Sequence, residues 1–250
     1  MSGREGAGGP LHLFLLPSAG GSRTLFAQWP DALRERLGDR VVTHAVELPG
    51  RGSRIAERPP TQLSAYVDEL AEQTPPPGTS WAVVGHSFGA LLGAEWAARA
   101  SARGSAPRLL VASAAAPPWV YSTAAALQAP LDELWTRVGE LGGLPAQLAD
   151  SPAARRLFGR ALTADFTAAA EYRPGRPMRT GCPVLAVQGE NDPLVRPALT
   201  RRWQECTDQG FTQRVLPGGH FYARGVDDLI PTVAEALLPL AAAPLPAPHA

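Results

Sequence analysis

The sequence contains no lysine, and this absence limits the chemistry available to the chain. All 23 basic residues are arginines, so a lysine nucleophile or a lysine Schiff base is excluded. The 23 acidic residues balance the arginines, giving a net charge of zero. A balanced chain has no global field that attracts nucleic acid or an anionic membrane. We therefore expect neither to be a main partner.

Cysteine and long apolar runs are also scarce. Cys182 and Cys206 are too few for a disulfide framework, and we expect both to be structural. No run approaches the ~20 apolar residues that a membrane span needs. Residues 1–10 are rich in glycine and lack the apolar stretch of a signal peptide. The expectation is a cytoplasmic, monomeric protein with a flexible N-terminus.

Short apolar runs alternate with segments of helical spacing along most of the chain. Strands are expected at 11–16, 40–48, 81–84, 109–115, 183–188 and 211–216. Helices are expected within 25–37 and at 63–73, 88–103, 131–141, 153–172, 198–206 and 226–240. This alternation is typical of a parallel sheet joined by right-handed crossovers. The sequence predicts a single α/β domain over residues 11–240.

The alternation is interrupted between residues 117 and 177, where only helical patterns occur. An insertion at this point of the chain would lie over the carboxyl ends of the strands, where ligands enter such folds. We interpret it as a lid; the alternative is a helical subdomain that only adds core. The Ala/Pro-rich segment 241–250 is expected to be a flexible tail.

The pattern that carries chemistry is Gly-His-Ser-Phe-Gly at residues 85–89. An apolar run precedes it and a segment of small residues with helical character follows, as in a strand, a sharp corner and a helix. Gly85 and Gly89 leave the space that a serine raised on such a corner needs. Ser87 is therefore the candidate nucleophile.

A serine hydroxyl is a poor nucleophile near neutral pH and needs a base, which in turn needs a group to orient it. The chain has five histidines. Four are set aside by position: His12 and His44 within presumed strands, His86 at the variable position of the corner and His249 in the tail. His220 remains, on a glycine-rich loop after the last strand, and is the candidate base.

The orienting acid is expected on a loop after a late strand, because folds with this corner use the chain order Ser, Asp or Glu, His. Asp192 follows the strand at 183–188 by a short turn and fits best, with Glu190 as the second candidate. Either carboxylate has a simpler interpretation as a turn former or a helix N-terminal charge. The three residues in this order predict a Ser87–Asp192–His220 triad.

Acyl transfer also needs hydrogen-bond donors for the oxyanion. In this arrangement they are the N–H of the residue after the nucleophile and one from the loop after an early strand. These positions assign the backbone N–H groups of Phe88 and Ala19, with Gly20 as the alternative to Ala19. Taken alone, the loop at residues 17–22 is equally well a flexible connection. The proposed chemistry requires no metal and no cofactor.

Several motifs resemble those of type II thioesterases, the free-standing α/β-hydrolases that accompany polyketide and nonribosomal peptide synthases. The segments that carry the resemblance are Leu-Pro-Ser-Ala-Gly-Gly-Ser at 16–22 with Trp29, Leu-Pro-Gly-Arg-Gly at 48–52, residues 85–90, Leu-Gly-Gly at 141–143, Ala-Asp-Phe at 164–166 with Tyr172, residues 189–193 and Pro-Gly-Gly-His-Phe at 217–221. The resemblance implies an α/β-hydrolase fold and hydrolysis of acyl thioesters on the phosphopantetheine arm of an acyl or peptidyl carrier protein. Phe88 stands where the family often has Met or Leu, a difference that concerns pocket shape.

Two further sets of residues are candidates for contacts with such a substrate. Lid residues that are candidates to line an acyl channel, or to pack within the insertion, are Trp135, Leu144, Phe158 and Phe166. Carrier proteins are acidic, and arginines that are candidates to meet one are Arg51, Arg54, Arg173, Arg176 and Arg179. The rival functions are a carboxylester hydrolase, a catalytically silent binding protein, and an enzyme that transfers the acyl group to an acceptor other than water.

Overall fold

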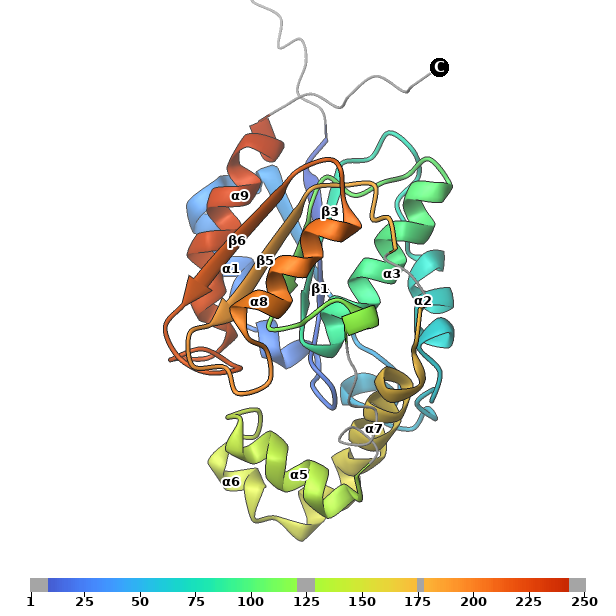
Figure 1. Cartoon of the computed structure of the whole chain (residues 1–250), viewed down its shortest axis with the longest axis vertical. Helices are drawn as coiled ribbons and strands as arrows, with labels where there is room; N and C mark the ends of the chain where they lie inside the picture. Colours follow the sequence, from blue (N-terminus) through green and yellow to red (C-terminus); the bar gives the residue numbers. More distant parts are fainter. Residues whose placement is uncertain (1–8, 121–128, 175–177, 243–250) are drawn as a thin grey trace, which may run out of the picture.

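The computed structural model describes residues 9–120, 129–174 and 178–242. Within them, parallel strands form one sheet in the order β2-β1-β3-β4-β5-β6 (Figure 1). The strands are β1 (Leu11–Leu16), β2 (Val41–Ala45), β3 (Trp81–His86), β4 (Leu110–Ser113), β5 (Val184–Gly189) and β6 (Phe211–Leu216). The expected parallel α/β architecture is confirmed. The predicted flexible ends lie largely outside the described residues, at 1–8 and 243–250.

The helices follow the expected order. They are α1 (Trp29–Leu37), α2 (Leu63–Glu72), α3 (Phe88–Ala102), α5 (Leu131–Glu140), α6 (Ala146–Ala149), α7 (Pro152–Glu171), α8 (Pro197–Thr200) and α9 (Ile230–Ala242). Throughout the part of the chain that the structure describes, none combines the length and apolar character needed to cross a membrane.

Two predicted helices need correction. Of residues 198–206, only the first part is α-helical, and Arg201–Cys206 is a 3₁₀ helix. Thr200, Trp203 and Cys206 are all fully buried, a spacing of three that matches the 3₁₀ repeat. The predicted helix at 226–240 begins as 3₁₀ at Val226–Leu229, and α9 starts only at Ile230. Pro231 lacks an N–H for an α-helical bond to the preceding turn, which explains the later start.

The sheet is buried on both faces. Leu13 of β1 faces the cluster formed with α1 and α9, and Phe14 faces the cluster formed with α2 and α3. Figure 1 shows these helix pairs on opposite sides of the strands. Because both faces are covered, the inner strands β1, β3, β4 and β5 consist of nearly continuous apolar residues, whereas the edge strands β2 and β6 carry partly exposed polar residues. Cys182 and Cys206 are free thiols within this core, and burial raises the pKa of Cys182 to about 12.

Helices α5, α6 and α7 follow β4 and lie beyond the ends of the strands (Figure 1). They share a small apolar cluster of their own that includes Trp135, Val138 and Leu162. Helix α7 also contacts α2 and α3, and so connects this helical layer to the body of the protein. Parts of the predicted lid at 121–128 and 175–177 lie outside the described residues.

Two glycines one turn apart on α3 provide a test of the packing. A Cβ on Gly89 would lie 2.2 Å from the Leu16 carbonyl oxygen, whereas one on Gly93 would find its nearest neighbour, Val83, at 3.3 Å. We expect Gly89→Ala to lower the free energy of unfolding by about 2–3 kcal/mol because the backbones must separate. Gly93→Ala should change it by less than about 1 kcal/mol, since the gain in helix propensity offsets mild crowding. Urea unfolding measures both; equal losses would contradict the described contact.

Candidate active site

Ser87 occupies the corner between β3 and α3 in a strained backbone conformation. Its φ of 54° and ψ of −114° lie in a region that non-glycine residues rarely adopt. The Ser87 amide donates to the Ser113 carbonyl at 2.8 Å, which ties the corner to β4. A Cβ on Gly85 would lie 2.1 Å from the Gly89 carbonyl oxygen, so Gly85 must lack a side chain for the chain to turn this sharply.

His220 and Asp192 lie next to Ser87 in the order that the sequence predicts. The His220 Nε2 atom is 3.0 Å from Ser87 Oγ, and its Nδ1 atom is 2.9 Å from Asp192 Oδ2. The second Asp192 oxygen accepts the amides of Leu194 and Val195 at 2.8 and 3.2 Å. His220 and Asp192 are both buried. The carboxylate is therefore held on one side by its own loop and faces the imidazole with the other.

Glu190, the second candidate for the acid, does not contact His220. It is exposed, and its carboxylate accepts a hydrogen bond from the neighbouring Asn191 side chain at 3.3 Å. One residue, Asn191, separates the two carboxylates, and the turn after β5 directs only that of Asp192 inward. Geometry thus favours Asp192 as the orienting acid.

The early glycine-rich loop forms a tight turn beside Ser87. The Gly21 amide donates to the Ser18 carbonyl at 2.9 Å, and Gly20 has a φ of +70°, as the third position of a type II turn requires. The Gly20 amide donates to Asp165 at 2.8 Å and is therefore not available to an oxyanion. Ala19 and Phe88, whose amides the sequence suggests as the two donors, both line the cavity at Ser87.

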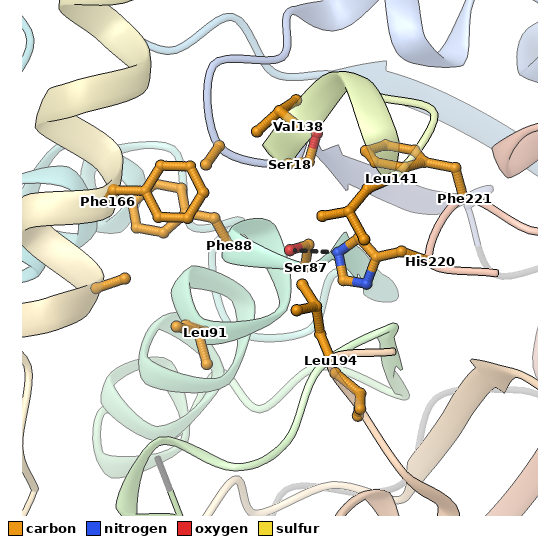
Figure 2. Close-up of a pocket in the computed structure, with 13 residues that line it drawn as sticks. Ser18, Ser87, Phe88, Leu91, Val138, Leu141, Phe166, Leu194, His220 and Phe221 are labelled. Atoms are coloured by element: carbon orange, nitrogen blue, oxygen red, sulfur yellow. Dashed lines mark hydrogen bonds between the residues drawn. The ribbon is translucent and has the colours of Figure 1, made fainter. Parts of the chain in front are cut away.

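An apolar cavity of about 90 Å³ opens at Ser87 and His220 (Figure 2). Two elements of the helical layer contribute to its wall: α5 supplies Val138, with Leu141 at its end, and α7 supplies Phe166 and Ala169. The remaining lining residues are Ser18, Ala19, Phe88, Leu91, Leu194, Val195 and Phe221.

Of the lid residues proposed for an acyl channel, only Phe166 lines this cavity. Trp135, Leu144 and Phe158 pack within the cluster of the helical layer instead. The Trp135 indole also donates to the Ala149 carbonyl at 2.8 Å. These three side chains pack within the helical layer and do not line the cavity.

His86 is a part of the site that the sequence did not reveal. It is completely buried, its Nδ1 is 2.8 Å from Ser113 Oγ, and that hydroxyl is 2.6 Å from the Tyr222 hydroxyl. Burial, with His220 nearby, holds the pKa of His86 well below its usual value, so this imidazole is neutral. The His86 ring also packs against Phe221, with ring centroids 4.8 Å apart. It therefore supports the loop that carries His220.

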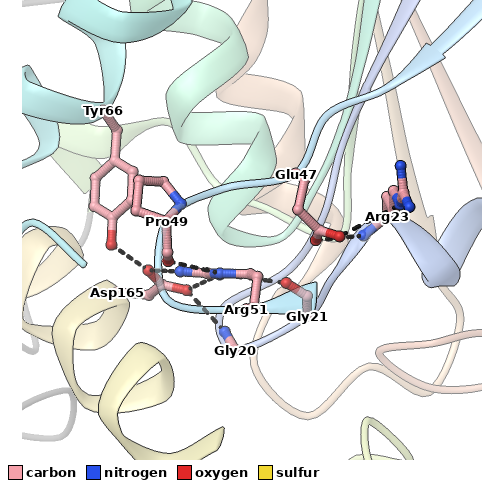
Figure 3. Close-up of polar contacts among 8 residues, drawn as sticks. All are labelled: Gly20, Gly21, Arg23, Glu47, Pro49, Arg51, Tyr66 and Asp165. Carbon is pink, nitrogen blue, oxygen red and sulfur yellow. Dashed lines mark hydrogen bonds and ion pairs between the residues drawn. The ribbon is translucent and has the colours of Figure 1, made fainter. Parts of the chain in front are cut away.

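Arg51, proposed as a docking residue, is buried, and that prediction is wrong. Its guanidinium forms a bidentate ion pair with Asp165 at 2.6 and 2.8 Å (Figure 3). The sequence does not reveal the burial of Arg51, because its partner Asp165 lies 114 residues away in the chain.

The other arginines proposed for docking differ in their accessibility. Arg54 is half-buried and paired with Glu57 and Glu69. Arg173 and Arg179 are exposed. Arg176 lies outside the described residues.

The arrangement has the parts needed for nucleophilic acyl transfer. A serine hydroxyl, an imidazole and a carboxylate are in hydrogen-bonding sequence, next to two backbone amides and an apolar cavity. Within the described ranges, no three His, Cys, Asp or Glu side chains gather as metal ligands.

Known proteins share this fold and much of this sequence. A sequence profile named Thioesterase domain matches residues 11–239. RedJ, a thioesterase of the prodiginine pathway in Streptomyces coelicolor, is 32% identical, with a TM-score of 0.79 over 92% of this chain and 91% of its own. BorB, a type II thioesterase from the borrelidin biosynthetic cluster, is also 32% identical, with a TM-score of 0.77 over 91% of this chain and 93% of its own.

A further relative is longer than this chain. A Streptomyces griseus protein named "Probable cadicidin biosynthesis thioesterase" is 31% identical over 94% of this chain, which spans 64% of that relative's length. The profile match covers nearly all of the described sheet and helices. The chain therefore has an α/β-hydrolase fold and belongs to the thioesterase family, whose members are hydrolases that act on thioesters.

Proposed function

We propose that this protein is a type II thioesterase that hydrolyses acyl groups from the phosphopantetheine arm of acyl or peptidyl carrier proteins. Ser87 is the nucleophile, His220 the general base and acid, and Asp192 the group that orients His220. The observation that carries the proposal is the continuous hydrogen-bonded series Ser87 Oγ, His220, Asp192 at 3.0 and 2.9 Å, beside an apolar cavity. The enzyme is expected to act in the cytoplasm as a monomer.

In the first step, Ser87 Oγ attacks the thioester carbonyl carbon and its proton passes to His220 Nε2. The carbonyl oxygen becomes an oxyanion, which the amides of Ala19 and Phe88 stabilise. When the tetrahedral intermediate collapses, the carbon–sulfur bond breaks and the acyl group remains on Ser87. The pantetheine sulfur leaves and takes the proton from His220, so the arm is released as a thiol and the imidazole is neutral again.

In the second step, water gives a proton to His220 and attacks the acyl–Ser87 ester. The same two amides hold the second oxyanion, and His220 returns a proton to Ser87 Oγ as the carboxylic acid leaves. Asp192 favours the imidazolium that forms in each step and keeps its Nε2 directed at Ser87. Leu194 and Val195 fix the carboxylate through their amides.

The substrate class is supported by the relatives and by the shape of the cavity. RedJ and BorB are named for biosynthetic pathways of secondary metabolites. The cavity accepts an apolar group and lies directly against Ser87, so an acyl chain can enter while the carbonyl faces the nucleophile. Exposed Arg173, two residues after the end of α7, and exposed Arg179 remain candidates for contact with an acidic carrier.

Replacement of the nucleophile tests the mechanism. Ser87→Ala should reduce kcat for an acyl-carrier thioester by about 10⁴- to 10⁶-fold, because the remaining site can no longer form the acyl-enzyme. Intact mass spectrometry of the carrier follows the loss of the acyl group. Labelling by a fluorophosphonate probe should be lost in parallel. Retention of most activity in Ser87→Ala would refute the assignment.

The two carboxylates after β5 form a matched pair for a second test. Asp192→Asn should reduce kcat by about 10⁴-fold, because the amide no longer stabilises the imidazolium or holds the required tautomer. Glu190→Gln removes a neighbouring, exposed charge and should leave kcat within about 2-fold, since surface charges contribute little. A large loss in Glu190→Gln with a small one in Asp192→Asn would reverse the choice of acid.

The carrier as partner is tested by comparing substrates with one acyl group. Hydrolysis of the acyl-carrier should exceed that of the acyl-pantetheine thioester and of the matching oxygen ester in kcat/KM. The double variant Arg173→Glu/Arg179→Glu should raise KM for the acyl-carrier by roughly 3- to 10-fold and leave the acyl-pantetheine unchanged, because only the protein substrate presents an acidic surface.

A charge-matched control is the double variant Arg34→Glu/Arg36→Glu on α1, where both side chains are exposed. It should leave KM for both substrates unchanged. Preference for the oxygen ester would favour the carboxylester hydrolase, and acyl transfer to an added amine or alcohol in place of water would favour the transferase. Absence of turnover on all three substrates would favour a binding protein.

A further inference from the structure

Asp165 on α7 lies at the centre of a buried polar cluster that the proposed mechanism does not use. Its carboxylate is completely buried and accepts four hydrogen bonds (Figure 3). Oδ2 accepts the Gly20 amide at 2.8 Å and one Arg51 nitrogen at 2.6 Å. Oδ1 accepts the second Arg51 nitrogen at 2.8 Å and the Tyr66 hydroxyl at 2.6 Å.

The cluster holds both sides of the Ser18–Gly21 turn. Asp165 binds the Gly20 amide, and Arg51, which is itself fixed by Asp165, donates to the Gly21 carbonyl at 3.3 Å. Helix α7 also touches the turn directly, since a Cβ on Gly20 would lie 2.8 Å from Leu162 Cδ1. The turn is thus fixed by side chains from α7 and from the loop after β2, in addition to its own hydrogen bond.

The protonation states of Tyr66 and Arg51 keep both side chains as hydrogen-bond donors to Asp165, which favours a fixed geometry. Burial and the Asp165 carboxylate raise the pKa of Tyr66, so the phenol remains a donor to Asp165. Burial alone lowers the pKa of Arg51, but the charge of Asp165 outweighs it and the pKa is raised, so the guanidinium stays charged. Arginine presents its donors in a rigid, planar fork that matches a carboxylate. Neither partner changes its charge near neutral pH.

We propose that Asp165 is a positioning residue for the oxyanion site: it holds the Gly20 amide so that the neighbouring Ala19 amide faces the Ser87 corner. The proposal rests on the proposed function, because it assumes that Ala19 and Phe88 stabilise the oxyanion. Phe166, the next residue of α7, lines the acyl cavity. The same turn of the lid helix therefore shapes the cavity and sets the oxyanion donor, so a displaced α7 impairs both.

Asp165→Asn tests the proposal, because it keeps the side-chain shape and removes the charge that orders Arg51 and the turn. The fluorophosphonate probe, reacted to completion, first counts the competent sites, so that kcat is expressed per reactive Ser87. We expect kcat per site for an acyl-pantetheine thioester to fall by roughly 10- to 100-fold, as displaced oxyanion donors produce. KM should stay within about 3-fold.

A transition-state analogue separates positioning from loss of structure. A trifluoromethyl ketone analogue of the substrate adds reversibly to Ser87 Oγ, whose proton passes to His220, and leaves an oxyanion in the proposed site. Its inhibition constant should rise by the same factor as kcat/KM falls. Unchanged kcat per site and unchanged inhibition in Asp165→Asn, with only a lower Tm, would show that the cluster is merely structural and overturn the proposal.

Tyr172→Phe is the matched control on the same helix. Its hydroxyl ties the end of α7 to Glu95 of α3 at 2.5 Å and does not touch the turn. Tyr172→Phe should lower Tm and leave kcat per site unchanged. A fall in kcat per site equal to that in Asp165→Asn would show that the effect comes from loosening the contact of α7 with α3, and would overturn the proposal.

A second variant covers the case in which Asp165→Asn does not fold around an unpaired Arg51. In Asp165→Leu/Arg51→Met, apolar groups replace the buried pair, an exchange that proteins often tolerate. The same fall in kcat per site and in analogue affinity is expected, because the turn again loses both contacts; parent-like values would overturn the proposal. Ser87→Ala, measured alongside, distinguishes failure of this inference from failure of the proposed function.

Discussion

The close approach of the backbone at the start of α3 to the backbone at the end of β1 determines where the chemical groups lie. A Cβ on Gly89 would fall 2.2 Å from the Leu16 oxygen and 2.7 Å from the Pro17 oxygen, so no side chain separates α3 from the end of β1. Ser87 precedes this contact by two residues, and the Ser18–Gly21 turn follows Pro17 directly. One contact therefore sets the distance between the proposed nucleophile and the proposed oxyanion donors.

Two buried carboxylates then perform different tasks because their partners differ. Asp192 faces His220, the imidazole that exchanges a proton with Ser87 in the proposed mechanism. Asp165 faces Arg51, a guanidinium that stays charged at any working pH. The Ser18–Gly21 turn must stay in place, and a partner of Asp165 that changed its charge during turnover would disturb it. Beside the proposed nucleophile, in contrast, a partner that changes its charge is required. The pairing of each carboxylate therefore suits the role we propose for it.

The order of the elements and the proposed catalytic residues were predictable from the sequence because their signals are local. A few neighbouring residues are enough to identify the Gly-x-Ser-x-Gly corner and the apolar runs. The same is true of the loop positions of Asp192 and His220. Arg51 was misassigned because its burial depends on the ion pair with Asp165, which lies 114 residues away in the chain. The helix predicted at 198–206 was partly wrong because helical spacing alone does not distinguish an α from a 3₁₀ repeat over so few residues.

His86 illustrates a constraint that no local pattern carries. At the variable position of the corner its side chain points into the core, where burial keeps it neutral and Ser113 satisfies its Nδ1 atom. A positive charge there, with ring centroids 5.5 Å from His220, would oppose formation of the imidazolium that the mechanism needs. Burial also raises the pKa of Tyr222, so the far end of this polar series is a neutral phenol. These two neutral neighbours are compatible with the proposed mechanism, in which His220 takes the proton of Ser87 and Asp192 provides the compensating charge.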